Sequence, residues 1–225
     1  RQSSLTSADC NLMDSWRHLL LLSVWWSTRV VPGSACHRVH HGDCQLLDHC
    51  HLVCVGASPT SLQGDISKNV RNVTLCAWPY KTFKVAQHLG HLREVEHFTL
   101  RHSEVEQIEP FHSHQALQTV NLTELQLTQM ERDMFSQLPV LHSVDLRHNR
   151  LSYLDQEIFS SLPALQTLYL AGNNWTCDPR LIWIISDVEG SVGSKVYDKQ
   201  KLFCEGKSKA MPKPLVQVMQ FVQCV

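Results

Sequence analysis

The stretch LQTVNLTELQLTQMERDMFSQLPV (residues 117–140) is followed directly by LHSVDLRHNRLSYLDQEIFSSLPA (141–164) and then by LQTLYLAGN (165–173). When the three lines are aligned, apolar residues occupy the same slots, and both full lines carry Phe-x-x-Leu-Pro near their ends. The full lines are 24 residues long. A fixed period of this length indicates structural units that stack and share one continuous core.

Within each unit the pattern L-x-x-L-x-L predicts a short, half-buried strand, because apolar and polar residues alternate. Asn149 and Asn173 occupy the next fixed slot, where an amide can satisfy backbone groups of a turn that would otherwise be buried and unpaired. Amphipathic helices do not explain the pattern, since Pro139 and Pro163 follow the phenylalanine segment each time. The motif and its period are those of the leucine-rich repeat. We therefore predict an α/β fold, a short leucine-rich repeat horseshoe with a parallel β-sheet on its concave face.

Two less regular units precede the quoted stretch. Residues 70–75 (VRNVTL) read as a degenerate strand, with Trp78 in the asparagine slot. The next unit begins at Val95, which is 22 residues before Leu117. The sequence thus predicts about five repeats over residues 70–173.

The N-terminal part has the features of a secretory signal. Met13 begins a short polar segment, Leu19 to Trp26 is apolar, and small residues follow, so cleavage is expected before Ser34 or Cys36. The apolar run is too short to span a bilayer. Residues 1–35 are therefore interpreted as an upstream segment plus a signal peptide, and we expect the protein to be extracellular.

The nine cysteines are consistent with export, because disulfides persist in oxidising compartments. Cys10 lies upstream of the signal, and residues 77–176, between the two groups formed by the other eight, contain none. These eight candidate disulfide cysteines cluster near the two ends of the repeats: Cys36, Cys44, Cys50, Cys54, Cys76, Cys177, Cys204 and Cys224. Both clusters have an odd number of members, so the spacing alone leaves the pairing open.

The end of the chain resembles the C-terminal cysteine cap of extracellular leucine-rich repeat proteins. That cap opens with N-x-W-x-C-x-C and an apolar helix, and residues 174–184 read NWTCDPRLIWI, with Pro179 in place of the second cysteine. The resemblance implies a Cys177–Cys204 disulfide and leaves Cys224 without its usual partner. Residues 174–225 are predicted to form this cap.

Residues 50–62 (CHLVCVGASPTSL) resemble the second half of the N-terminal cysteine cap of the same family, although no C-x-C is present. Residues 36–69 are therefore predicted to form an N-terminal cap. Histidines are dense among its cysteines, and a zinc site is the alternative, although close C-x-x-C or H-x-x-x-H pairs are absent. These histidines are His37, His40, His41, His49 and His51.

The family is exported and works by binding, usually other proteins, on its sheet face. The resemblance therefore implies a secreted or cell-surface protein that recognises a protein ligand on its concave or lateral face. The alternatives are the ectodomain of a membrane-anchored receptor or adhesion protein whose anchor lies beyond Val225, and a structural matrix component. Motifs of serine hydrolases, zinc proteases and dinucleotide-binding enzymes are absent, so neither enzyme activity nor a cofactor is expected. A net charge of −1 gives no bias towards nucleic acid.

In each predicted strand the second and third apolar slots point inwards, so the residues between and beside them line the concave side. They form three rows: His97, Thr119, Ser143 and Thr167; then Thr99, Asn121, Asp145 and Tyr169; then Arg101, Thr123, Arg147 and Ala171. The candidate protein-binding residues among them are His97, Thr99, Arg101, Asn121, Asp145, Arg147 and Tyr169.

Two further features bear on binding. N-x-[ST] sequons predict glycosylation at Asn72, Asn121 and Asn174, and a glycan on Asn121 would cover the centre of the concave face. The C-terminal cap is rich in lysine, which predicts either a solvated face or attachment to anionic glycans or lipid headgroups. These lysines are Lys195, Lys199, Lys201, Lys207, Lys209 and Lys213.

Overall fold

The computed structural model describes residues 36–47, 50–58, 62, 69–205 and 213–222. The signal-like segment, Cys10, His49, Lys207, Lys209 and Cys224 lie outside these residues. No helix in the described ranges is long and apolar enough to cross a bilayer.

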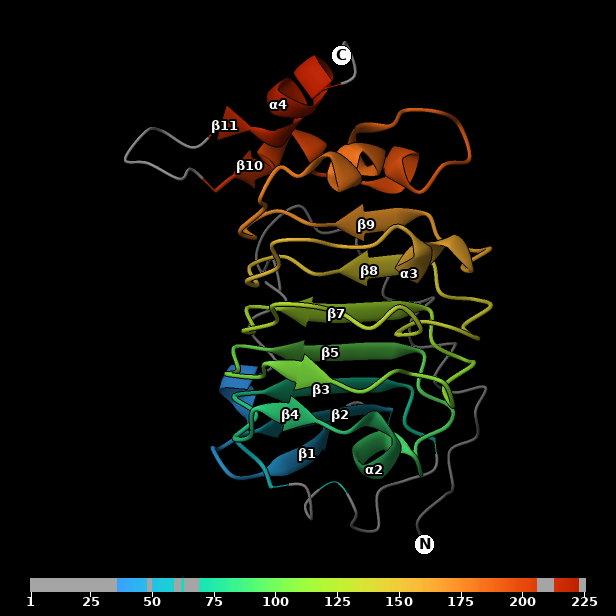
Figure 1. Cartoon of the computed structure of the whole chain (residues 1–225). Helices are drawn as coiled ribbons and strands as arrows, with labels where there is room; N and C mark the ends of the chain where they lie inside the picture. Colours follow the sequence, from blue (N-terminus) through green and yellow to red (C-terminus); the bar gives the residue numbers. More distant parts are fainter. Residues whose placement is uncertain (1–35, 48–49, 59–61, 63–68, 206–212, 223–225) are drawn as a thin grey trace, which may run out of the picture.

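One seven-stranded sheet runs through the molecule in the order β1-β2-β3-β5-β7-β8-β9. Figure 1 shows its strands stacked like rungs, with the C-terminal cap beyond β9. β1 and β2 pair antiparallel, and all later neighbours pair parallel. The strands are β1 (Cys44–Leu47), β2 (His51–Val55), β3 (Asn72–Cys76), β5 (His97–Arg101), β7 (Thr119–Thr123), β8 (Ser143–Asp145) and β9 (Thr167–Tyr169). The predicted parallel-strand solenoid is confirmed.

Within the described residues, the elements outside the main sheet are short. Besides the main sheet there are two small ones, β4 (Thr82–Phe83) with β6 (Gln107–Ile108), and β10 (Phe203–Cys204) with β11 (Lys213–Pro214). The α-helices are α2 (Val85–Leu89), α3 (Glu157–Ser160) and α4 (Leu215–Val222). The 3-10 helices are η1 (Cys36–Arg38), η3 (Pro179–Ile185), η4 (Gly193–Lys195) and η5 (Lys199–Lys201).

Alternating burial along the strands gives the solenoid its core. In β5 and β7 every second side chain is buried. Behind the strands, the phenylalanines of successive units form a stacked column, with ring centres 6.2 Å apart for Phe111 and Phe135 and 6.0 Å for Phe135 and Phe159. Trp183 of η3 lies 6.1 Å from Phe159 and ends the column. No single repeat could bury such a ring on both faces, so stacking supplies the stability.

The asparagine slot also acts as the pattern predicts. Asn149 donates through its side-chain amide to the carbonyls of Leu122 (2.7 Å) and Leu146 (3.0 Å) and accepts from the Leu127 amide (3.3 Å). Asn173 repeats these bonds one turn later. In an earlier repeat a serine takes the place of the asparagine. The Ser103 hydroxyl accepts a hydrogen bond from the Trp78 amide (2.9 Å). Buried carbonyls of adjacent turns are thereby satisfied.

Disulfides close both ends of the described solenoid. Cys44 on β1 pairs with Cys54 on β2, and Cys36 pairs with Cys76 on β3, which ties the N-terminal cap to the first repeat. At the other end Cys177 pairs with Cys204, as the family resemblance implied, with 5.4 Å between their Cα atoms. Cys50 is also disulfide-bonded.

Candidate functional site: the C-terminal end of the concave face

The predicted concave residues lie side by side across the strands. Thr99 is in register with Asn121, Asn121 with Asp145, and Asp145 with Tyr169. A second row runs through His97, Thr119, Ser143 and Thr167. Arg101 pairs in register with Thr123, and Arg147 and Ala171 lie two residues beyond the ends of β8 and β9. The sheet therefore brings together residues from positions 97 to 171 of the chain.

The Arg147 side chain on this face is held in place by several hydrogen bonds. Its Nε donates to both carboxylate oxygens of Asp145, at 2.9 and 3.0 Å, and its backbone amide donates to the same carboxylate at 3.0 Å. These bonds raise the pKa of Arg147. The Arg147 side chain is still 43% exposed, whereas that of Asp145 is 10% exposed. Asp145 thus fixes the guanidinium and leaves part of it open to solvent.

This arrangement corrects the prediction for two of the concave positions. Asp145, a candidate binding residue, is buried beneath the arginine that it holds, so its role is to position Arg147. Ala171 is also buried, and its amide donates to Asp198 of the C-terminal cap at 2.9 Å. Neither side chain is available for direct contact with a partner.

Tyr169 and Tyr197 complete the cluster. The guanidinium carbon of Arg147 lies 4.8 Å from the centre of the Tyr169 ring, within the range of a cation–π contact. The Tyr197 ring centre is 5.3 Å from that of Tyr169, and Tyr197 is 75% exposed. Arg147, Tyr169 and Tyr197 are hereafter called the Arg–Tyr cluster.

Tyr197 was missed by the sequence reasoning because the repeat pattern stops after Asn173. In the structure the cap adds one more rung, since Val196 forms a parallel bridge with Leu168 and the Tyr197 amide donates to the Leu168 carbonyl at 2.9 Å. Asp198 then accepts from the amides of Leu170 (2.9 Å) and Ala171. A signal for this extra rung is present in the sequence. Tyr197 follows Tyr169 by 28 residues and is flanked by Val196 and Asp198.

The three sequons differ in access. Asn174 is exposed and Asn72 is half-buried. Asn121 is half-buried on the concave face, and its Oδ1 atom is buried with no hydrogen-bond partner in the described structure. His97, on the same face, bonds the Thr119 hydroxyl at 2.8 Å through Nδ1. A glycan on Asn121 would stand two strands from Tyr169.

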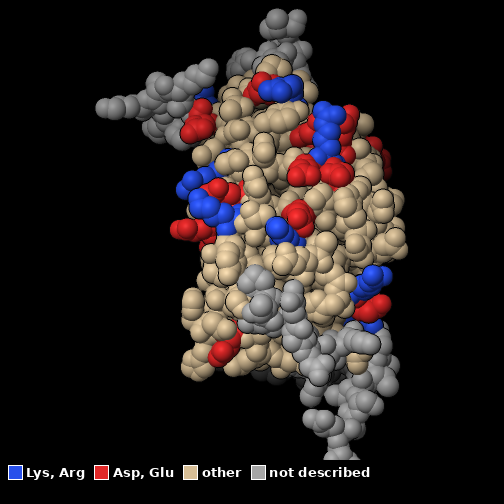
Figure 2. All heavy atoms as spheres, turned by 60° about the horizontal axis from the view of Figure 1, so that its bottom comes forward, with Lys and Arg blue, Asp and Glu red and all other residues tan. Residues whose placement is uncertain are grey.

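Among the four described lysines of the lysine-rich cap, one is largely withdrawn from solvent. The Lys199 side chain is only 13% exposed, because Nζ donates to the Ser186 carbonyl at 2.8 Å and pairs with Asp187. Lys201 and Lys213 are exposed and Lys195 is half-buried. Elsewhere charges pair between turns, as for Lys81 with Glu106 at 2.6 Å. Figure 2 shows blue and red groups side by side on the face in view.

In the N-terminal cap, the described histidines do not converge on a metal site. Among the described residues, no group of three or more His, Cys, Asp or Glu side chains is placed to hold a metal ion. His51 instead bonds the Thr74 hydroxyl of the neighbouring strand at 2.9 Å. Four of the cysteines in this region are in the two disulfides described above.

One family model matches the repeat region of the chain. The family model described as "Leucine rich repeat" matches residues 115–174. These residues are leucine-rich repeats. No curated protein matches the chain. Among solved structures, the crystal structure of the TLR13-ssRNA13 complex is similar at 18% identity with a TM-score of 0.49. The match covers 61% of this chain, and this chain spans only 20% of that one.

Proposed function

We propose that this leucine-rich repeat protein is an extracellular recognition protein that binds a protein partner at the C-terminal end of its concave face. The Arg–Tyr cluster is the observation that carries the proposal. Tyrosine and arginine are over-represented among residues that dominate binding energy. Here they form one contiguous surface, and Tyr197 is largely exposed.

Preorganisation supports the same conclusion. A free arginine loses side-chain entropy when a partner immobilises it, at a cost of about 0.5–1.5 kcal/mol. Arg147 is already held by Asp145 and by the Tyr169 ring. A partner carboxylate or backbone carbonyl could therefore bond the exposed guanidinium nitrogens with little further ordering. The tyrosine rings would supply apolar area together with a hydroxyl.

The extracellular location rests on the cysteines and on the signal-like N-terminus. Disulfides of this kind are typical of exported domains, and both ends of the described solenoid carry them. Edman sequencing or mass spectrometry of protein from culture medium tests the processing. We expect the chain to start at Ser34 or Cys36. A start at Arg1 or Met13, or retention in the cytosol, contradicts the extracellular location.

A comparative capture experiment tests the binding proposal. Glycosylated wild-type protein and the Tyr169→Ala/Tyr197→Ala variant are each used to capture cell-surface and matrix proteins, which are identified by mass spectrometry. We expect at least one protein to be retained by the wild type and lost with the variant. The variant must show the wild-type melting temperature, since neither ring belongs to the repeat core.

Arg180→Ala provides the matched control. Arg180 bonds Asp178 through Nε at 2.8 Å, and its guanidinium carbon lies 4.4 Å from the Tyr153 ring centre, so it makes the same two kinds of contact as Arg147 at a more exposed position outside the concave rows. Its bonds hold the pKa of Asp178 at about 2. If the partner is still captured by Arg180→Ala but no longer by Tyr169→Ala/Tyr197→Ala, the partner binds on the concave face. The reverse result places the partner elsewhere and overturns the proposal.

The Asn121 sequon gives a second test on the same ligand. If a glycan shields the centre of the face, Asn121→Gln strengthens binding. If the site is unoccupied, the substitution changes binding little. Intact-mass measurement of the secreted protein determines occupancy and so decides which result applies.

A further inference from the structure

The two ends of the main sheet differ in how their outer strands are covered. At the C-terminal end, Val196 bridges Leu168 of β9, and Asp198 accepts from the Leu170 amide at 2.9 Å. At the N-terminal end the outermost strand is β1, and β2 is its only strand partner within the described residues. Figure 1 shows β1 at the end of the stack that lies away from the C-terminal cap. The outer edge of β1 therefore has no covering strand in the described part of the chain.

The hydrogen-bond pattern identifies which backbone groups of β1 face outwards. The Val55 amide donates to the Asp43 carbonyl at 3.1 Å, so Cys44 and Cys54 face each other as a pair without backbone hydrogen bonds between them. Their Cα atoms are 4.1 Å apart, as expected for the closer kind of antiparallel pair. The two kinds of pair alternate, so Leu46 belongs to the next pair of this kind. The N–H and C=O groups of Cys44 and Leu46 thus point away from β2, and among the described residues they have no backbone partner.

The side chains along this edge are accessible and uncharged. Gln45 and Leu46 are both exposed, and the exposed fraction of Leu46 is 43%. Leu46 is in register with the core residue Leu52 and is the outermost member of that row in the described structure. The strand Cys44–Leu47 contains no charged residue. Soluble proteins usually protect an edge strand with lysine, proline or a covering element, and the described part of β1 has none of these.

An open, uncharged edge can be completed by an identical edge, because antiparallel pairing about a twofold axis is self-complementary. We propose that two copies of this chain associate through β1, so that their main sheets become continuous. In the register that uses all the outward groups, Gln45 lies opposite Gln45 of the second copy. Cys44 then lies opposite Leu46 of the second copy, and each such pair exchanges two hydrogen bonds.

Charge and apolar area both favour a second copy as the occupant. Asp43 is the charged residue next to β1, and in this register it lies opposite Leu47 of the second copy. The two Asp43 side chains are then four positions apart along the strands, about 13 Å, which exceeds the Debye length of about 8 Å at physiological salt. Leu46 would pack over the Cys44–Cys54 disulfide of the second copy and leave water. Two copies therefore meet without like charges in contact, and each covers the exposed leucine of the other.

The arrangement also has a consequence for the concave face. Residues opposite each other in an antiparallel pair lie on the same face of the sheet, so both concave faces point to the same side. The Arg–Tyr clusters lie beside β8, β9 and the C-terminal cap, at the outer ends of the joined sheet, and both stay accessible. The dimer would therefore be bivalent for a partner of the concave face. The association itself does not depend on the Arg–Tyr cluster.

Sedimentation velocity of the purified, disulfide-bonded protein between about 1 and 200 µM tests the association. We expect a monomer–dimer equilibrium with a dissociation constant in the micromolar range, because the contact is small. Leu46→Lys should raise this constant at least about tenfold, since it places two like charges diagonally across the joined edges. Val140→Lys is the matched control, because Val140 is also 43% exposed but lies between β7 and β8. It should change the constant less than about twofold.

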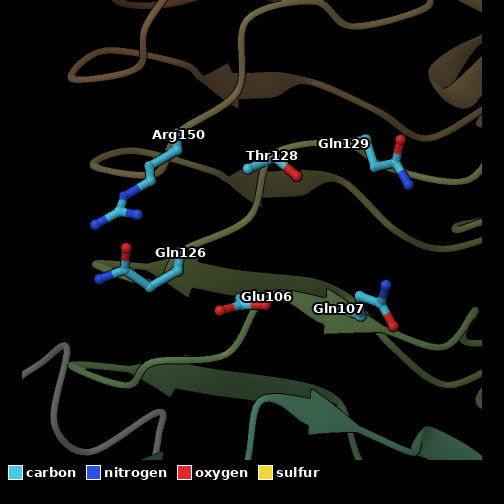
Figure 3. Close-up of a pocket in the computed structure, with 6 residues that line it drawn as sticks. All are labelled: Glu106, Gln107, Gln126, Thr128, Gln129 and Arg150. Carbon is cyan, nitrogen blue, oxygen red and sulfur yellow. The ribbon is translucent and has the colours of Figure 1, made fainter.

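Gln45→Cys tests the register and keeps Leu46 at the edge. In the proposed register the two copies of residue 45 form a pair without hydrogen bonds, with Cα atoms about 4.5 Å apart, which a disulfide can bridge. Mild oxidation should give a covalent dimer, and a peptide map should place the new bond between the two copies of residue 45. Gln129→Cys is the control, at another exposed glutamine. Figure 3 shows Gln129 beside a hollow of about 240 Å³, which is lined by segments that follow β5, β7 and β8.

Each measurement has a result that overturns the proposal. A protein that is monomeric over the whole concentration range does not associate through β1. Equal shifts of the equilibrium by Leu46→Lys and its control place the contact elsewhere. Gln45→Cys that crosslinks no better than its control or the wild type excludes the register. A dimer that is lost in Tyr169→Ala/Tyr197→Ala but kept in Leu46→Lys would show that the copies meet at the Arg–Tyr cluster instead.

Discussion

The guanidinium carbon of Arg147 lies 4.8 Å from the centre of the Tyr169 ring, while its Nε bonds both carboxylate oxygens of Asp145. Asp145 and Tyr169 are themselves partners in register on β8 and β9. One arginine therefore connects two neighbouring rungs on the concave face, and Tyr197 extends the surface by one more rung. The concave face, which is mostly polar, therefore ends in aromatic rings that are held in place near the C-terminal cap.

Arg147→Lys should weaken binding of the concave-face partner by more than about 1 kcal/mol, the usual scale for an important interface residue. Lysine keeps the charge, but it cannot bond both Asp145 oxygens in a fork or lie flat on Tyr169. The free energy of unfolding should change by less than about 1 kcal/mol, because lysine keeps a positive charge beside Asp145 and the backbone amide of residue 147 still donates to that carboxylate. Titration calorimetry and thermal denaturation measure the two effects. Arg180→Lys is the control and should leave the affinity unchanged. Unchanged affinity in Arg147→Lys as well would contradict a role for Arg147 in binding.

Asp198→Ala should lower the free energy of unfolding by about 2–4 kcal/mol. The substitution leaves the buried amides of Leu170 and Ala171 without acceptors, and each such loss costs about 1–3 kcal/mol. Chemical denaturation measures the loss, and hydrogen exchange should accelerate at these two amides. Asp187→Ala, at a side chain that is 89% exposed, should cost less than about 1 kcal/mol. Equal effects of the two substitutions would exclude a specific role for Asp198 in closing the sheet.

Cys177→Ser should destabilise the protein by about 2–5 kcal/mol, the range for a native disulfide in a small exported domain. The lost bond joins the start of the C-terminal cap to β10, so hydrogen exchange should increase mainly around η3 and β9. A peptide map without reduction should link Cys177 to Cys204 in the wild type. A map that links Cys177 to Cys224 would show a different pairing.

Stability should fall as the pH drops below about 6.5, the ordinary pKa of histidine. His114 is buried, its Nε2 lies 3.1 Å from the Leu89 carbonyl, and its Nδ1 has no partner among the described residues. Burial lowers the pKa of His114 in the folded state, with a smaller contribution from Arg93. Burial also lowers the pKa of His88. The unfolded chain therefore binds more protons below pH 6.5, and folding loses stability there until the folded-state pKa is reached.

His114→Gln keeps a donor for the Leu89 carbonyl and removes the titrating ring. We expect it to reduce the slope of unfolding free energy against pH between about 6.5 and 5, whatever its effect at neutral pH. His91→Gln, at an exposed position, is the control. Urea denaturation at a series of pH values gives the slopes. Parallel curves for His114→Gln and wild type would show that His114 does not cause the acid sensitivity.

Gly172→Ala should destabilise the last repeat more than Gly190→Ala. Gly172 has a φ of +74°, and an added Cβ would lie 2.4 Å from Nδ1 of the His148 ring. Gly190 has a similar φ of +80° but open space around it, so it reports backbone strain alone, about 1 kcal/mol. Chemical denaturation of both variants gives the difference. The double variant Gly172→Ala/His148→Ala removes the clash between the new Cβ and the His148 ring, so it should be more stable than Gly172→Ala. If it is not, the clash with His148 does not cause the destabilisation.

The sequence by itself determined the rungs of this protein and the direction of their side chains. Strand alternation depends only on neighbouring residues, so Val120 and Leu122 turn inwards and Thr119 and Asn121 turn outwards wherever the pattern holds. The asparagine slot was equally predictable, because the bonds of Asn149 are made within its own turn and to the adjacent one. Each repeat of the pattern repeats the same local physics, so the period itself reveals the stacking.

Only the tertiary structure decided what happens where the repetition ends. Tyr197 joins the concave rows because Asp198 takes over the amides that a further strand would have bonded. Lys199 leaves the basic surface because Asp187, twelve residues earlier, folds against it. These outcomes depend on which distant groups meet across the fold, and the leucine-rich repeat pattern, which stops after Asn173, does not specify them.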